Sequence, residues 1–218
     1  MGYQLIIDTS AGTSVALTRA GAPIAEYNDS SNMKHAEGIG AAIADVLAQG
    51  GVKAKDVATV VVGRGPAPFT GLRVGIAAAV MFAEGAGAKL FGVVSLDAIA
   101  LEALNDEAIA AQVAAGVPLL VTADARRQEV YWGLYSGVSK SGAPICIEGP
   151  GVIKPAALAE LMQQRGVQPI EVSSTVFATR LSQVFDAQVI DGTASQDVSA
   201  LYLREPDAVP SPGKKVSG

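Results

Sequence analysis

Short runs of apolar residues, separated by glycine-containing turns, open the chain. Three of them cover residues 4–9, 14–19 and 23–27. Runs of this length joined by such turns predict an antiparallel meander of three strands. A fourth run, at residues 59–62, is β-branched throughout, which is typical of a strand buried between two layers.

After residue 34 the apolar positions change from the period of a strand to that of a helix. The helical spacing continues to residue 49, where two glycines end it. A second helix is predicted over residues 70–84, and its interior, residues 74–83, is apolar all the way round. Because such a helix is usually buried on more than one side, we expect one face to cover the sheet and another to meet a partner.

Shorter patterns predict the remaining elements. Ser95 is expected to cap a helix that ends at residue 104, and the softer stretch after residue 105 divides the chain into an N-terminal lobe, residues 1–105, and a C-terminal lobe, residues 106–218. We further expect strands at residues 90–94, 119–124 and 129–135, strand pieces at 145–147, 152–153, 170–172 and 189–190, helices at 155–164 and 196–202, and a mobile tail from residue 206. This order predicts an α/β protein with mixed sheets covered by helices.

Composition and charge exclude several classes of protein. Half of the 218 residues are hydrophobic and 17% are charged, which excludes a disordered chain. The charge-free run at residues 74–83 is far shorter than the ~20 residues of a membrane span, and no secretory signal is evident. A net charge of −5 predicts weak binding to nucleic acid by the chain alone. One Cys and one His cannot form an internal disulfide or a structural zinc site, and they fit a reducing, cytoplasmic setting.

The first candidate site is the turn that begins with Asp8, Thr9 and Ser10. A carboxylate at the end of a strand, followed by hydroxyl groups and a glycine, offers backbone N–H groups to an anion and an acid to a hydrated Mg²⁺. Such residues also populate ordinary hairpin turns. Both interpretations stay open at this turn.

The second candidate is the loop over residues 63–73. Two prolines stiffen it, Thr70 is placed to cap the helix that follows, and Arg64 and Arg73 flank the positive end of that helix. The loop therefore suits an anion. The alternative is a rigid connection between strand and helix with arginines on the surface.

Three further features are weaker candidates. The arginines of the turn at residues 124–131 suit a phosphate or an acidic partner, although such a cluster is more often a solvated hairpin tip with local ion pairs. His35 has neither a nucleophile nor an orienting group beside it in the sequence, so packing at the helix end is the simpler interpretation. Trp132 and Cys146 have only structural interpretations.

Taken together, these motifs resemble the TsaB (YeaZ) family. The resemblance is carried by IDTS followed by SVAL, by KHAE, by the loop GRGP-x-x-FTGLR running into VGIAAA, and by SLDAIA, DARRQEVY and a late YLRE. It covers residues 3–136 and 201–205 and is faint between residues 140 and 195. The loop departs from the family pattern at Ala67 and Pro68, where Gly-Ser is usual.

The resemblance implies a two-lobed fold of the actin, Hsp70 and sugar-kinase type. It also implies a non-catalytic subunit that works with TsaD and TsaE to transfer threonylcarbamoyl from threonylcarbamoyl-AMP to the tRNA adenosine beside the anticodon. Catalysis and the metal are expected in TsaD, the tRNA is expected to bind only through the complex, and no membrane is involved. The alternative is an autonomous kinase or ATPase of the same fold. No cofactor is expected in this chain, although ATP or ADP at the complex interface is possible through the partners.

The two helices of the N-terminal lobe are rich in alanine and contain glycine, so a partner helix can approach closely, and we expect the partner surface there. A lone chain is expected to form a homodimer through this patch, because a monomer would expose it. The residues predicted to form it are Ile43, Ala44, Val74, Gly75, Ala78, Ala79, Val80 and Met81.

Overall fold

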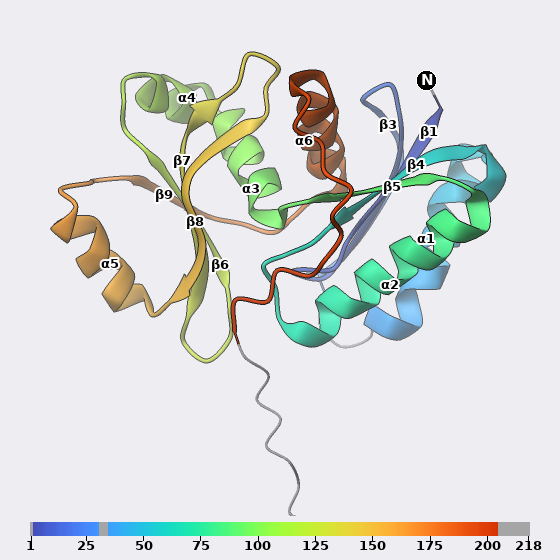
Figure 1. Ribbon diagram of the computed structural model, residues 1–218, viewed down its shortest axis with the longest axis horizontal. Helices are drawn as coiled ribbons and strands as arrows, with labels where there is room; N and C mark the ends of the chain where they lie inside the picture. Colours follow the sequence, from blue (N-terminus) through green and yellow to red (C-terminus); the bar gives the residue numbers. More distant parts are fainter. Residues whose placement is uncertain (1, 31–34, 205–218) are drawn as a thin grey trace, which may run out of the picture.

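The structure is a computed structural model that describes residues 2–30 and 35–204. It contains two mixed sheets with helices between and outside them (Figure 1). The first sheet has the strand order β3-β2-β1-β4-β5, in which β1, β2 and β3 are antiparallel neighbours and β4 and β5 run parallel to β1. Its strands are β1 (Tyr3–Asp8), β2 (Thr13–Arg19), β3 (Ala22–Asp29), β4 (Val57–Gly63) and β5 (Lys89–Val93). The three-strand meander predicted from the sequence is confirmed.

The second sheet repeats this plan with one strand fewer. Its order is β8-β7-β6-β9, with β6, β7 and β8 antiparallel and β9 parallel to β6. The strands are β6 (Leu119–Asp124), β7 (Val130–Val138), β8 (Pro144–Ile153) and β9 (Ile170–Ser173). We call the part of the molecule built on the first sheet the first lobe, and the part built on the second sheet the second lobe.

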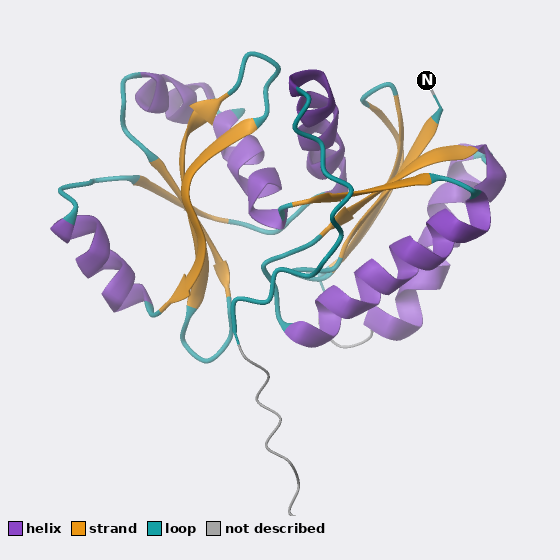
Figure 2. Cartoon of the chain, viewed as in Figure 1, coloured by secondary structure: helices purple, strands orange, loops and turns teal. Residues whose placement is uncertain are grey.

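Six α-helices and one short 3-10 helix complete the described part of the chain. In Figure 2 the helices flank the sheets, and two of them, α3 and α6, lie between the sheets. Their bounds are α1 (His35–Gly50), η1 (Ala54–Asp56), α2 (Phe69–Ala86), α3 (Ser95–Leu104), α4 (Glu107–Ala114), α5 (Pro155–Gln164) and α6 (Ala178–Asp191).

Burial on both faces explains the continuous apolar character of β1. Leu5 and Ile7 join the core beneath α1 and α2, whereas Ile6 points to the opposite core, which holds α3 and α6. On the far face of the second sheet, α5 packs Leu158 and Met162 against Trp132. The layers therefore run α1 and α2, first sheet, α3 and α6, second sheet, α5. This two-lobed α/β fold, with mixed sheets covered by helices, agrees with the predicted fold class.

The C-terminal third departs from the predicted elements. The apolar residues of α6 follow helical spacing on one face only, and residues 189–190, predicted as a strand piece, form its exposed last turns. The helix predicted at 196–202 is wrong, because this segment forms no helix and is preceded by Ser195, which pairs with Gly92 at the edge of β5. The two strand pieces at 145–147 and 152–153 belong to one strand, β8, and α4 was not predicted.

Two predictions about the organisation of the chain remain open. The lobe boundary after residue 105 stays a prediction, and α6, which follows it, packs on strands of the first sheet. The mobile tail lies outside the described residues.

By length and composition alone, α2 qualifies as a membrane span. In this fold it packs one side, with Leu72, Gly75, Ala79 and Ala83, against the first sheet and its neighbours. Only 22% of this helix is buried, so most of it lies outside the core.

Candidate functional site

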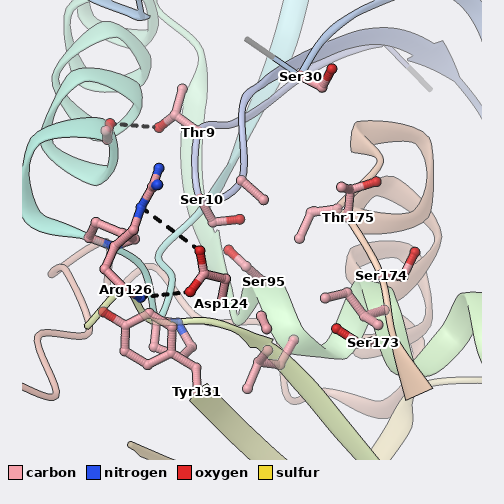
Figure 3. Close-up of a pocket in the computed structure, with 18 of the residues that line it drawn as sticks. Thr9, Ser10, Ser30, Ser95, Asp124, Arg126, Tyr131, Ser173, Ser174 and Thr175 are labelled. Atoms are coloured by element: carbon pink, nitrogen blue, oxygen red, sulfur yellow. Dashed lines mark hydrogen bonds and ion pairs between the residues drawn. The ribbon is translucent and has the colours of Figure 1, made fainter. Parts of the chain in front are cut away.

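A cleft of about 690 Å³ opens between the two lobes (Figure 3). It lies where β1, β4, β6 and β9 end, and the carboxyl ends of parallel strands are where α/β sheets bind ligands. Hydroxyl groups and one ion pair supply most of its polar lining. The polar residues are Thr9, Ser10, Ser30, Thr70, Ser95, Asp124, Arg126, Tyr131, Ser173, Ser174 and Thr175.

The wall of the first lobe is built around a buried carboxyl group. Asp8 is only 2% exposed, and it accepts hydrogen bonds from the Ser10 N–H at 2.8 Å and from the Ser95 Oγ at 2.7 Å. Burial raises the pKa of Asp8, and the hydrogen bonds from Ser10 and Ser95 lower it, with a net rise. Gly63 makes this position possible, since a Cβ there would lie 1.8 Å from Asp8 Oδ2. Asp8 therefore holds the ends of β1, β4 and α3 together.

The residues around Asp8 also form hydrogen bonds within the protein. Thr9 donates its hydroxyl to the Gly71 carbonyl at 2.8 Å, and the bare backbone of Gly75 leaves room for it. The predicted capping role of Ser95 is wrong, because Val94 occupies the N-cap position and the Ser95 hydroxyl bridges Asp8 and the Gly65 N–H. Of the predicted trio, Ser10 is the residue that lines the cleft while remaining partly exposed.

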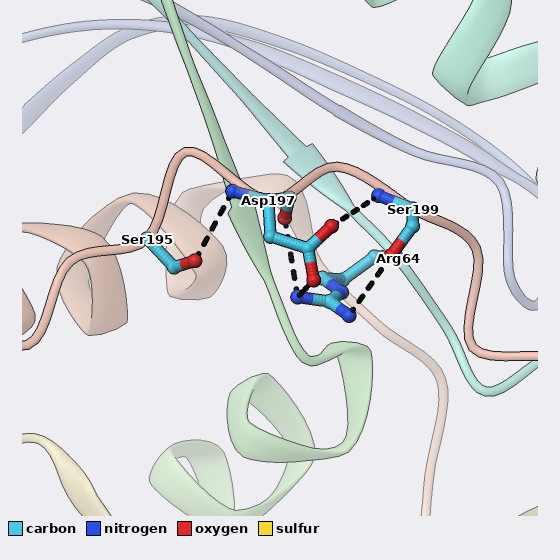
Figure 4. Close-up of polar contacts among 4 residues, drawn as sticks. All are labelled: Arg64, Ser195, Asp197 and Ser199. Atoms are coloured by element: carbon cyan, nitrogen blue, oxygen red, sulfur yellow. Dashed lines mark hydrogen bonds and ion pairs between the residues drawn. The ribbon is translucent and has the colours of Figure 1, made fainter.

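Arg64 does not face the cleft as an anion ligand. Its guanidinium pairs with Asp197 at 2.8 Å, donates to the Asp197 carbonyl at 3.1 Å and to Ser199 Oγ at 3.5 Å, while its Nε is buried without a hydrogen-bond partner (Figure 4). Hydrogen bonds from Ser199, together with the charge of Arg64, lower the pKa of Asp197. Arg64 thus anchors residues 195–204, which we call the C-terminal strap.

Arg73 and Thr70 also differ from their predicted roles. The Arg73 guanidinium donates to the Tyr202 hydroxyl at 2.9 Å and lies 5.3 Å from the centre of the Phe69 ring. Thr70 sits in the first turn of α2, whose N-cap is Pro68, and its exposed side chain lines the cleft. Of the loop residues predicted to bind an anion, only Thr70 lines the cleft, and the two arginines hold the strap.

The turn of the second lobe has an unusual backbone. Arg126, Arg127 and Gln128 all have positive φ angles, between 53° and 64°, a region that side chains other than glycine seldom adopt. Asp124 accepts the Arg126 N–H at 2.8 Å and lies 4.0 Å from its guanidinium. Burial, and then the charge of Asp124, raise the pKa of Tyr131, so its hydroxyl stays a neutral donor. This turn carries the only ion pair in the polar lining of the cleft that the structure describes.

The predicted partner surface divides into an outer part and a buried part. Ala44, Val80 and Met81 are exposed, and Met81 is 75% exposed. Ile43, Gly75 and Ala79 were wrongly assigned to this surface, because they are buried beneath the helices. Val74 and Ala78 are half-buried and pack on the core. The available outer face is therefore narrower than predicted.

In the described part of the chain no three His, Cys, Asp or Glu side chains gather as they would around a metal ion. The side chain of His35 lies outside the described residues. Cys146 is exposed on β8, where its thiol donates to the Glu148 carbonyl at 3.3 Å.

Comparison with known proteins relates this architecture to one family. The model of the family described as TsaD, tRNA N6-adenosine threonylcarbamoyltransferase, matches residues 29–201. The tRNA threonylcarbamoyladenosine biosynthesis protein TsaB of Escherichia coli is 34% identical over 161 residues, which are 73% of this chain and 66% of that protein. The chain belongs to the TsaB family. TsaB proteins take part in the biosynthesis of threonylcarbamoyladenosine in tRNA, and membership places the chain in that process.

Two further comparisons define the extent of the TsaB similarity. An uncharacterised protein of Mycobacterium leprae is 36% identical over 155 residues, and these span 69% of this chain but only 39% of that protein. The solved structure of YeaZ from Pseudomonas aeruginosa has a TM-score of 0.73 at 24% identity, covering 93% of this chain and all of the other. That likeness establishes the two-lobed fold.

Proposed function

We propose that this chain is a non-catalytic scaffold subunit of the threonylcarbamoyl transferase that modifies tRNA. In this proposal it acts in the cytoplasm with TsaD and TsaE, and the transfer from threonylcarbamoyl-AMP to the adenosine beside the anticodon takes place in TsaD. The tRNA binds to the assembled complex, and the lone chain forms a homodimer.

The observation that carries this proposal is the apolar outer face of α2. Val80 and Met81 are 36% and 75% exposed and belong to none of the apolar core clusters of the described residues. The helix α1 contacts α2 and has an exposed Ala44, a small side chain that allows another helix to approach closely. An apolar helix face rimmed by small residues suits packing against helices of a partner.

The site of the first lobe supports the non-catalytic part of the proposal. Asp8 is enclosed by the hydroxyls of Ser10 and Ser95, so a hydrated Mg²⁺ would have to displace both. Arg64 and Arg73 hold the strap and offer little to a phosphate group. We therefore expect no ATP turnover by the single chain and no cofactor of its own, with any ATP or ADP held at the interface with a partner.

Paired substitutions test the proposed surface. Met81→Arg places a charge on the outer face of α2, and Ile190→Arg places the same charge on α6, at a residue that is equally exposed at 75%. An unpaired arginine buried in an interface costs about 3 kcal/mol or more, equivalent to over a hundredfold in Kd. We expect Met81→Arg to lose TsaD in a pull-down, to become monomeric in light scattering and to fail in the tRNA modification assay, whereas Ile190→Arg behaves as the parent chain.

Circular dichroism melts distinguish loss of the surface from loss of the fold. Both variants should melt close to the parent, because both side chains are on the surface, while Ala79→Arg should unfold because Ala79 is fully buried. A folded Met81→Arg chain that still binds TsaD normally would rule out this surface. ATP turnover by the purified chain would favour the kinase or ATPase alternative.

A further inference from the structure

Cationic and aromatic side chains gather at one end of the molecule, where the strap reaches the second lobe. We call Phe69, Arg73, Arg126, Arg127, Tyr202 and Arg204 the basic–aromatic patch. Phe69 and Arg73 come from the first turns of α2, Arg126 and Arg127 from the turn between β6 and β7, and Tyr202 and Arg204 from the strap. Three segments far apart in the sequence therefore build a single surface.

The aromatic part of the patch is ordered by stacking. The rings of Phe69 and Tyr202 lie 4.3 Å apart between centroids and 15° from parallel, and Tyr202 remains 38% exposed. The Arg73 guanidinium lies within 5.5 Å of both ring centres and fixes the Tyr202 hydroxyl. Two stacked rings with an arginine against them form a rigid platform.

The strap itself is firmly held, so the platform is a built feature. Gly92 donates to the Ser195 carbonyl at 2.9 Å, Leu201 donates to the Arg64 carbonyl at 2.8 Å, and Arg64 pairs with Asp197 at 2.8 Å. At its end, Arg204 pairs with Glu129 and donates to the Arg126 carbonyl at 3.3 Å.

The patch carries positive charge in a protein that is acidic overall. Of its four arginines, Arg126 pairs with Asp124 and Arg204 pairs with Glu129, in a chain whose formal net charge is −5. The patch contains a pocket of about 200 Å³. Three aromatic residues and three arginines line it: Phe69, Tyr131, Tyr202, Arg126, Arg127 and Arg204.

We propose that the basic–aromatic patch binds the unpaired nucleotides of an RNA loop, with a base stacked in the pocket against Tyr202 and phosphates held by Arg126 and Arg127. Single-stranded nucleic acid is recognised by this combination of aromatic platforms and arginines along the backbone. An acidic peptide would use the arginines but gain nothing from the stacked rings, which favours RNA as the occupant. The inference rests on the proposed role in tRNA modification and assigns this chain a direct contact with the RNA.

The charge of the patch is tested by a double substitution, Arg126→Gln with Arg127→Gln. Both substitutions keep the contacts of Arg204 with the Arg126 carbonyl and with Glu129, which hold the end of the strap. The matched control is Lys53→Gln with Lys55→Gln, which removes the same charge from exposed residues at η1, before β4 and thus at the opposite end of the sheet from the cleft. Both pairs raise the net negative charge equally.

The probe is the anticodon-arm hairpin of a tRNA, measured by fluorescence anisotropy with the full chain alone at low salt and with the chain assembled with TsaD. We expect the arginine pair to weaken binding about tenfold and to reduce the slope of log K against log salt by about 1 to 2, and the lysine pair to change neither. Tyr202→Phe should bind as the parent does, and Tyr202→Leu should bind about tenfold more weakly because the stacking surface is lost.

Each outcome bears on the inference. Equal loss in both charge pairs would mean general electrostatic attraction and would overturn it, as would unchanged binding in the arginine pair. A free nucleotide that displaces the hairpin at equal concentration would identify a mononucleotide pocket and reject the RNA loop. Since the measurement on the chain alone does not require TsaD, failure of the complex to form would contradict the proposed function without deciding the patch.

Discussion

The two lobes repeat one plan of strands but treat the aspartate that ends the first strand in opposite ways. In the first lobe Asp8 ends β1 and is 2% exposed, whereas in the second lobe Asp124 ends β6 and its side chain is 72% exposed. Both strands have an antiparallel neighbour that follows in the chain and a parallel neighbour that comes later. The aspartate at the same position of a repeated topology is therefore buried in one lobe and exposed to solvent in the other.

The difference arises from the residues around each aspartate. Gly63, the last residue of β4, leaves space that Asp8 fills, and Ser95 approaches from α3 to donate to it. Asp124, like Asp8, accepts an N–H from its own turn, but its other partner is Arg126, which pairs with it on the surface. The polar groups around Asp8 are therefore bonded inside the protein, whereas those around Asp124 lie on the surface, where a ligand or a partner can reach them.

The largest expected effect comes from filling the space beside Asp8. Gly63→Ala would place a Cβ 1.8 Å from Asp8 Oδ2 and 2.8 Å from Ser95 Oγ. Overpacking and lost hydrogen bonds should lower the free energy of unfolding by about 3 kcal/mol. Ser173→Ala, at the last residue of the corresponding strand β9, should change it by less than about 0.5 kcal/mol.

Urea unfolding followed by circular dichroism measures both variants. Similar stability for Gly63→Ala and Ser173→Ala would show that the two strand ends are equally tolerant and would remove the contrast between the lobes.

A second buried carboxyl group sharpens the comparison. Asp97 in the first turn of α3 accepts the Tyr135 hydroxyl of β7 at 2.9 Å, and burial raises its pKa to about 7 despite this hydrogen bond. Since the unfolded chain ionises near pH 4 and the folded chain near pH 7, ionisation removes stability as the pH rises between these values. Asp97→Asn keeps an acceptor for Tyr135 and should gain stability over the parent as the pH rises from about 4 to about 7, with no difference below about pH 4. The shift of about three pKa units sets an upper limit of about 4 kcal/mol on this gain.

Thermal melts of the two proteins across that range measure this gain. Asp8 is present in both proteins, so its own raised pKa cancels in the difference. If the stability gained by Asp97→Asn did not depend on pH, or if the variant were less stable than the parent at high pH, ionised Asp97 would not destabilise the folded chain.

Local sequence patterns predicted most of the elements because their apolar positions follow one period over a long enough stretch. Apart from β8, which was predicted as two pieces, the strands of both meanders and the helices α1, α2, α3 and α5 were predicted within a few residues. Clear boundary signals helped, such as Pro155 at the start of α5 and Gly51 after the end of α1. The strap was wrongly predicted as a helix because its course depends on contacts with Gly92 and Arg64, more than a hundred residues earlier in the chain.

The candidate site was predicted less well, for a related reason. The sequence indicated that Asp8, Arg64 and Arg73 are functional residues, but it contained no sign that Ser95, Asp197 and Tyr202 would occupy them. Contacts between distant segments decide which polar residue remains available for a ligand. The late YLRE motif, which holds both Tyr202 and Arg204, contributed to the family resemblance but did not indicate these contacts.

The smallest predicted effect tests the turn of the second lobe, where Gln128 is exposed and has a φ of 60°. The left-handed region costs a side-chain-bearing residue about 1 kcal/mol. Glycine avoids that cost but loses more entropy on folding, so Gln128→Gly should stabilise the chain by about 0.5 kcal/mol.

The matching change in the first lobe should have the opposite effect. Gly12 has a φ of 125°, and a Cβ there would lie 2.5 Å from the Asp29 carbonyl oxygen, so Gly12→Ala should be clearly destabilising. Urea midpoints of the two variants, measured side by side, give opposite signs if the second turn stores strain that the first turn relieves with glycine. A destabilised Gln128→Gly chain would mean that the contacts of this turn outweigh its backbone strain, and the contrast between the lobes would then rest on their aspartates alone.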